Sequence, residues 1–175
     1  VGLITYMRTD SLRISGEAQA QAKELIHSRY GAAYYPAAPR VYKTKAGAQD
    51  AHEAIRPTSL VHTPDSLEKY LNKDQLKLYT LVWQRFAASQ MTPAIYDTMA
   101  IAIKAGDRYD LRANGSRLKF AGFTKVYAGA ETTKKEKDVL LPELEEGDVL
   151  NIAKTLPQQH FTEPPPRYND ASLVK

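Results

Sequence analysis

The sequence contains no cysteine, only one tryptophan and no long hydrophobic run. Without cysteine the chain has no disulfide, no thiolate zinc site and no thiol nucleophile, so any covalent chemistry must use another side chain. No apolar run approaches the roughly 20 residues that a membrane-spanning helix needs. No basic segment followed by an apolar one stands at the N-terminus, and no glycine-rich phosphate loop occurs. We expect neither a membrane partner nor export, and a cytosolic origin fits.

The chain has 175 residues, of which 43% are hydrophobic, so it is long enough for one full domain or two small ones. Its net charge is +4, and this excess lies in one half. Residues 1–92 carry 12 basic and 8 acidic side chains, whereas residues 93–175 carry 12 of each. A basic first half favours a polyanionic partner. Because the chain begins at Val1 and stops where a helix begins, we expect a piece of a longer protein.

The first half is predicted to be helical. Ser15 is suited to cap a helix that Gly31 ends, and Thr63-Pro64 to open a short helix. The strongest pattern predicts a helix over residues 73–91, with a polar cap at Asn72 and a stop at Thr92-Pro93. The apolar stripe of that helix, which we expect to face the core, holds Leu76, Tyr79, Trp83 and Phe86.

After Pro93 the hydrophobic period changes from 3.6 to 2, which is typical of strands. We predict a strand over residues 95–103, a turn at Gly106-Asp107, a hairpin turn at Asn114-Gly115 and a return strand over residues 117–120.

The rest of the second half is predicted to hold a charged loop at 131–138 and further strands within 144–156. A stiff proline connector at 164–166 precedes a helix that Asn169 or Asp170 caps. The predicted fold class is α+β: a helical domain over residues 1–92, a β-rich antiparallel segment over 93–160, and a connector over 161–175.

The segment 5–11 (TYMRTDS) crowds a phenol, a guanidinium, hydroxyls and a carboxylate at the end of an apolar run. A tyrosine has an ordinary pKa near 10, so its attack on a phosphodiester needs a nearby cation. In an extended segment Tyr6 and Arg8 face the same phosphate while Met7 packs inward. The plainer alternative is a tyrosine that packs at a strand end and a surface ion pair of Arg8 with Asp10.

A second group of polar residues is predicted to form two helical turns over residues 49–56. On a helix, His52 and Arg56 share a face that suits a phosphate. The alternative is a surface ion-pair cluster of His52 with Asp50 and Glu53. The second histidine that a helical zinc motif needs is missing, so we predict no metal ligand here.

A basic and aromatic loop is predicted between the first helix and this segment. Charge and stacking in such a loop suit a single nucleic-acid strand, although the tyrosines also suit packing. The residues concerned are Tyr34, Tyr35, Tyr42, Arg40, Lys43 and Lys45.

Together, residues 2–11 (GLITYMRTDS) and 48–58 (AQDAHEAIRPT) resemble the catalytic region of the type IA DNA topoisomerases, in the form of bacterial topoisomerase I. Residues 79–91, 93–97 and 161–175 are similar to the same family in the same order, so the resemblance spans nearly the whole chain. Met7 is typical of the topoisomerase I form, because topoisomerase III relatives usually have proline and reverse gyrases often histidine at that position.

The resemblance implies that Tyr6 attacks single-stranded DNA and becomes linked to the 5′ phosphate. Religation then needs no ATP, and strand passage relaxes negative supercoils. Arg8 would hold the scissile phosphate, His52 would contact phosphate beside it, and Arg56 would assist. The matching Thr9 and Asp10 would orient the site or bind DNA.

The resemblance also implies Mg²⁺, bound by an acidic Toprim domain that these 175 residues do not contain. The isolated chain would then be inactive and would depend on the remaining domains of the same polypeptide. The expected fold is a tyrosine-bearing gate domain on a β-rich arch, and the expected location is the cytoplasm, at the nucleoid. The alternatives are a non-catalytic single-stranded-DNA-binding or hinge module, and a relative of topoisomerase III.

Overall fold

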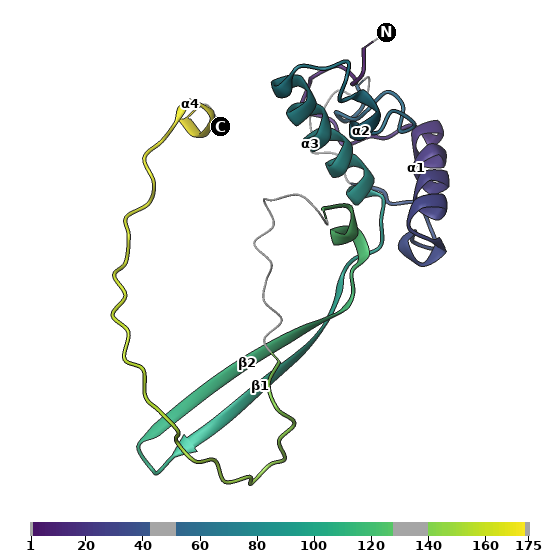
Figure 1. Ribbon diagram of the computed structural model, residues 1–175. Helices are drawn as coiled ribbons and strands as arrows, with labels where there is room; N and C mark the ends of the chain where they lie inside the picture. Colours follow the sequence, from purple (N-terminus) through teal and green to yellow (C-terminus); the bar gives the residue numbers. More distant parts are fainter. Residues whose placement is uncertain (1, 43–51, 128–139, 174–175) are drawn as a thin grey trace. The chain divides into compact units, whose positions relative to one another are not determined.

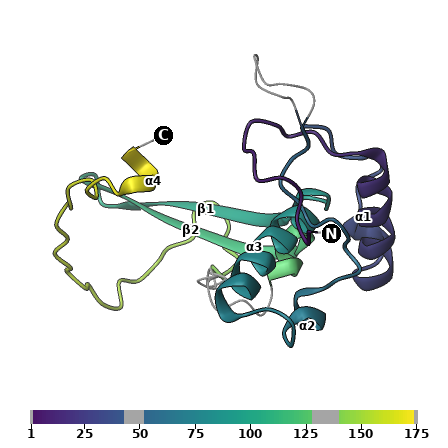
Figure 2. The ribbon, with the colours of Figure 1, turned by 90° about the horizontal axis from the view of Figure 1, so that it is seen from above.

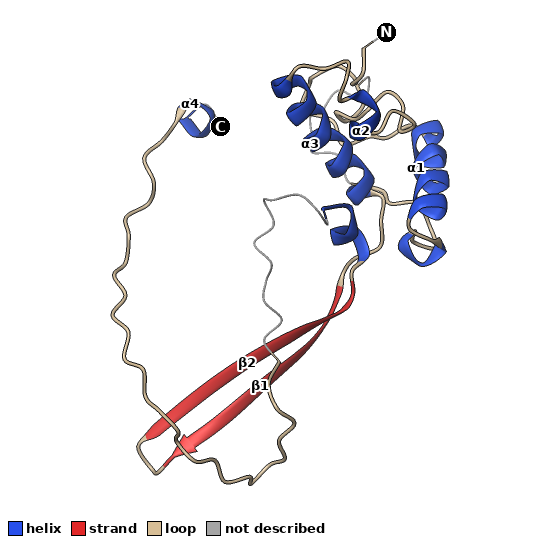
Figure 3. Ribbon diagram, viewed as in Figure 1, coloured by secondary structure: helices blue, strands red, loops and turns tan. Residues whose placement is uncertain are grey.

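The computed structural model describes residues 2–42, 52–127 and 140–173, which form two compact units divided between Leu141 and Pro142. The first unit contains a helical body and a long two-stranded ribbon, as Figures 1 and 3 show. The α+β class is therefore confirmed. The predicted domain boundaries stay a prediction. In the described part of the chain, no helix has the length and apolar character required to cross a membrane.

Helix α1 (Gly16–Arg29) begins and ends where its capping residues stand. The Ser15 side chain accepts a hydrogen bond from the backbone N–H of Ala18, which confirms the predicted N-cap. Gly31 follows the helix with a φ of 101°, a conformation that side chains disfavour. A short 3₁₀ helix, η1 (Ala32–Tyr34), comes next.

Helix α3 (Lys73–Ser89) buries one face in the helical body, and α2 (Pro64–Leu67) precedes it in the chain (Figure 2). Asn72 and Gln75 form a capping box, each side chain bonded to the other's backbone N–H. Trp83 and Phe86 are 3% and 5% exposed, so their predicted core position is confirmed. The buried core that they share with α1 includes Ala18, Ala22, Ile26, Leu60, Tyr79, Ala87 and Met91.

The ribbon consists of β1 (Ile95–Ala105) and β2 (Tyr109–Phe120), paired antiparallel. Its turn lies at residues 106–108, where Gly106 has a φ of 61°. The predicted turn at Asn114-Gly115 is wrong, because both residues lie within β2 and pair with Ala100 and Met99. The first turn already allows nearly every residue of β1 to find a partner, and a second turn would break that ladder.

The ribbon joins the helical body through a few backbone hydrogen bonds around Thr92. The Thr92 N–H donates to the Tyr34 carbonyl at 2.9 Å, and the Phe123 N–H donates to the Thr92 carbonyl at 2.9 Å. Phe123 belongs to a second 3₁₀ helix, η2 (Gly122–Tyr127). Tyr34 also packs on Phe120, with ring centroids 4.7 Å apart. Because α3 ends at Ser89 and β1 begins at Ile95, the predicted change from helix to strand at Thr92-Pro93 is confirmed.

The second unit is extended over most of its length. The strands predicted within residues 144–156 are wrong: this stretch contains only a turn at Glu146-Gly147. Its apolar side chains Val149 and Ile152 are 90% and 75% exposed, so no packed face stabilises a strand there. Helix α4 (Asp170–Leu173) is capped by the Asn169 side chain, as predicted. The predicted charged loop at 131–138 lies outside the described residues.

Candidate active site

The two polar motifs of the sequence meet as paired extended segments. Ile4 forms an antiparallel bridge with Pro57. On either side of it the Thr5 N–H donates to the Arg56 carbonyl at 2.9 Å, and the Thr58 N–H donates to the Leu3 carbonyl at 3.0 Å. This pairing places residues 3–5, just before Tyr6, against residues 56–58, which follow His52 in the chain.

The helix predicted over residues 49–56 is wrong for its described part, 52–56, which contains no helix and has a bend at Ile55. The backbone of this part is paired elsewhere: the Ala54 N–H donates to the Arg13 carbonyl at 2.8 Å. The Thr5 hydroxyl donates to the Ala54 carbonyl at 2.9 Å and accepts from the Arg56 N–H at 3.0 Å. These partners replace the i to i+4 bonds of a helix, so the shared helical face of His52 and Arg56 does not exist.

Tyr6, Arg8 and His52 nevertheless gather at one place. The Tyr6 ring is 76% exposed, and its centroid lies 5.9 Å from that of His52. The Arg8 Nη1 lies 3.0 Å from His52 Nε2. Because a guanidinium only donates, Nε2 is the acceptor and the imidazole proton belongs on Nδ1. An accessible phenol thus stands beside a cation and an imidazole, a set of groups suited to a phosphate.

Met7 does not pack inward, contrary to the prediction, because its side chain is 70% exposed. The Arg8 N–H donates to the Tyr6 carbonyl at 2.9 Å, so the chain turns tightly at Met7 instead of continuing as a strand. The alternation of a strand therefore fails at this residue. Tyr6 and Arg8 still belong to one group, because each lies next to His52.

Asp10 holds Arg8 in place, and Ser11 holds His52. Asp10 Oδ2 lies 2.8 Å from Arg8 Nε, while its Oδ1 is buried without a partner among the described residues. The Ser11 hydroxyl donates to the His52 carbonyl at 2.6 Å and accepts from the Arg13 N–H at 3.2 Å. Ser11 is 4% exposed, and sequence reasoning gave it no role. Its burial was not visible in the sequence.

Arg56 is bound within the protein. Its guanidinium lies 2.6 Å from Glu53 Oε2 and donates to the Pro57 carbonyl at 3.0 Å and to the Ser15 hydroxyl at 3.4 Å. The side chain is only 13% exposed. In this arrangement Arg56 ties the 52–57 segment to the start of α1. Its predicted contact with DNA stays a prediction, as does that of Thr9.

The predicted basic loop divides into two parts. Tyr34 packs on Phe120, and Tyr35 lies edge-on to His27 with ring centroids 5.6 Å apart. Arg40 and Tyr42, by contrast, line an open cavity. Lys43 and Lys45 lie outside the described residues.

A magnesium site does not fit this group of residues. Among the described parts of the chain, no three histidine, aspartate or glutamate side chains stand close enough to share a metal ion. The carboxylate within the tyrosine motif, Asp10, is bound to the Arg8 guanidinium.

Comparisons with known proteins show the family to which the chain belongs. The chain matches the family model described as DNA topoisomerase over residues 1–175. It therefore belongs to the bacterial DNA topoisomerase family, of type IA. It is also similar to the full-length topoisomerase I of Thermotoga maritima, with a TM-score of 0.69 and 38% identity over 85% of this chain. The match covers 22% of the Thermotoga chain.

Proposed function

We propose that this chain supplies the nucleophile of a type IA topoisomerase. The isomerase transiently cleaves one DNA strand, passes a strand through the gap and religates it, which relaxes negative supercoils. The observation that carries this proposal is the exposed Tyr6 phenol beside both Arg8 and His52. Family membership supports it independently.

In the reaction the Tyr6 oxygen attacks the scissile phosphorus and loses its proton. A bond forms between the phosphorus and the Tyr6 oxygen, and the bond to the 3′ oxygen breaks. The departing oxygen takes up a proton and becomes a 3′ hydroxyl, leaving a 5′-phosphotyrosine. Because one phosphoester replaces another, the reverse attack by the hydroxyl reseals the strand without ATP.

The neighbours of Tyr6 have separate roles in this proposal. Arg8 offsets the charge that develops on the phosphate. Its Nε is held by Asp10 and its Nη1 by His52, while Nη2 has no partner among the described residues and is free for a phosphate oxygen. His52 positions Arg8 and lies against the same phosphate.

The remaining components lie outside these residues. We propose that Mg²⁺ binds to carboxylates of another domain of the same polypeptide, and that the isolated chain is inactive without it. The proposed partner is single-stranded or negatively supercoiled DNA in the cytoplasm, at the nucleoid. A bound magnesium ion would supply positive charge near the phosphates.

The test is Tyr6→Phe in the full-length protein. We expect the covalent adduct with a labelled single strand to disappear while equilibrium binding of the strand changes less than about twofold, because only the hydroxyl is removed. Tyr70→Phe is the matched control, since Tyr70 is also exposed, at 80%, and takes no part in this group. An adduct that persists in Tyr6→Phe would exclude Tyr6 as the nucleophile.

A further inference from the structure

The surface is hollowed where the ribbon joins the helical body. The cavity has a volume of about 400 Å³, within the range of sites that bind small molecules. Tyr6, Arg8 and His52 are not part of its wall. The side chains that give the cavity its chemical character are Arg40, Tyr42, Arg85, Phe123 and Tyr127.

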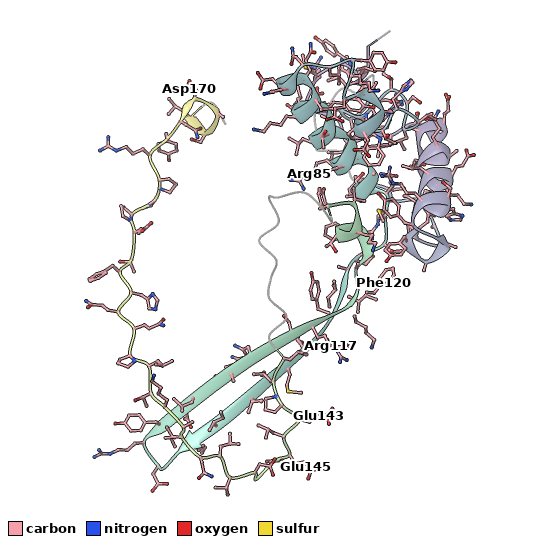
Figure 4. The ribbon with its side chains drawn as sticks, in the orientation of Figure 1. Arg85, Arg117, Phe120, Glu143, Glu145 and Asp170 are labelled. Atoms are coloured by element: carbon pink, nitrogen blue, oxygen red, sulfur yellow. The ribbon has the colours of Figure 1, made fainter. Side chains whose placement is uncertain are left out.

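Two guanidinium groups make the cavity positive. No acidic side chain lines it, and neither Arg40 nor Arg85 forms an ion pair within the described residues. Arg85 projects from the last turns of α3 (Figure 4), and the Arg40 backbone is held by a hydrogen bond from the Gln19 side chain at 3.1 Å. This contrasts with Arg56, whose charge is neutralised by Glu53. Two unpaired arginines in one cavity favour an anionic ligand.

Aromatic rings form much of the rest of the wall. The Tyr42 hydroxyl donates to the Ser89 carbonyl, and the Phe123 backbone is bonded to Thr92. Both residues are thus held in place while their side chains remain 39% and 40% exposed. A ring that is fixed and partly open is suited to stacking on a nucleobase.

We propose that this cavity binds one nucleotide of a single DNA strand, with its phosphate on Arg40 and Arg85 and its base against Tyr42 or Phe123. The inference rests on the proposed function and adds a second strand contact at the root of the ribbon. We do not expect double-stranded DNA to bind in this way. In a duplex each base face is already stacked on the next base and is not available to Tyr42 or Phe123. Since the wall combines α3 with η2, a bound strand contacts both α3 and the 3₁₀ helix that follows the ribbon in the chain.

The test measures binding of a fluorescent oligothymidylate to the full-length protein across a range of salt concentrations. The protein carries Tyr6→Phe, so that only equilibrium binding is measured. We expect Arg85→Gln to weaken binding about fivefold and to lower the slope of log K against log salt by about 0.7, the value for one phosphate of a single strand. Lys77→Gln, an exposed cation on the same helix but outside the cavity, is the matched control and changes neither quantity.

Stacking is tested separately. Phe123→Leu removes the ring and keeps an apolar side chain, so we expect about fivefold weaker binding with an unchanged salt slope. An oligonucleotide with 5-iodouracil, cross-linked by light and mapped by mass spectrometry, is expected to label Tyr42, Phe123 or Tyr127.

Three outcomes would overturn the proposal: equal effects of Arg85→Gln and Lys77→Gln, cross-links confined to residues outside the cavity, or competition by thymidine monophosphate as strong per nucleotide as that by the oligomer. The last outcome would assign the cavity to a free nucleotide. Adduct formation by Tyr6 in the otherwise unmodified protein is a separate measurement, so failure of this inference is distinguishable from failure of the proposed nucleophile.

Discussion

Ser11→Ala tests whether the hydrogen bond from the Ser11 hydroxyl to the His52 backbone carbonyl holds His52 in place beside Tyr6. The Ser11 hydroxyl is almost fully buried and joins two segments, donating to the His52 carbonyl at 2.6 Å and accepting from the Arg13 N–H at 3.2 Å. Alanine removes both bonds and adds no bulk. The variant therefore leaves a backbone carbonyl and an N–H without their partner.

The expected cost follows from that burial. A buried polar group that loses its partner costs about 1–3 kcal/mol, and 1 kcal/mol lowers the Tm of a domain of about 150–250 residues, the class nearest in size to the first unit, by roughly 2–4 °C. If about 1.4 kcal/mol of this loss falls on the placement of His52, the rate of adduct formation decreases about tenfold. We expect both effects in Ser11→Ala.

The assay combines thermal unfolding, followed by circular dichroism, with single-turnover adduct formation well below the Tm. Tyr79→Phe is the matched control for stability, because it removes a buried hydroxyl that donates to the His62 carbonyl at 2.6 Å, in a different part of the structure. We expect Tyr79→Phe to lower the Tm and leave the adduct rate unchanged. An unchanged adduct rate in a Ser11→Ala protein with lowered Tm would refute a positioning role for Ser11.

Two further predictions concern the fold. Asn72→Ala removes one half of the capping box, so we expect the free energy of unfolding measured in urea to fall by about 1 kcal/mol. An unchanged free energy of unfolding would contradict a stabilising role for this cap. Gly122→Ala puts a Cβ 2.3 Å from the Pro93 carbonyl oxygen at a φ of 48°, so we expect a loss of at least about 2 kcal/mol. Gly31→Ala, also at positive φ but with open space around it, is expected to lose less stability. Equal losses in the two variants would contradict a steric overlap at Gly122.

The elements whose signals are local could be predicted from the sequence. The caps at Ser15, Asn72 and Asn169 and the end of the helical part at Thr92-Pro93 depend on a few neighbouring residues, and all are confirmed. The turn at Asn114-Gly115 was a local signal that failed, because pairing with the whole of β1 outweighs the preference of two residues. The predicted strands of 144–156 failed because no segment among the described residues pairs with this stretch.

The candidate site was also predictable only in part. Residue types made Tyr6, Arg8 and His52 candidates without excluding surface ion pairs, and the family resemblance favoured a catalytic role. The structure places the three residues together. The secondary structure around His52 was not predictable, because the helical period of residues 49–56 gives no sign of pairing with a segment some 50 positions earlier. Ser11, Arg85 and Phe123 were missed because their importance comes from tertiary contacts.

The long-range pairing does leave one trace in the sequence, a threonine in each motif. The Thr5 hydroxyl bonds to the Ala54 carbonyl and the Arg56 N–H, while the Thr58 hydroxyl donates to the Gly2 carbonyl at 2.8 Å. Each threonine therefore bonds across to the other segment through both its backbone and its side chain, which fixes a single register. A shift by one residue would break these bonds together and move Tyr6 relative to His52. The threonines thus connect two motifs that are distant in sequence into one site.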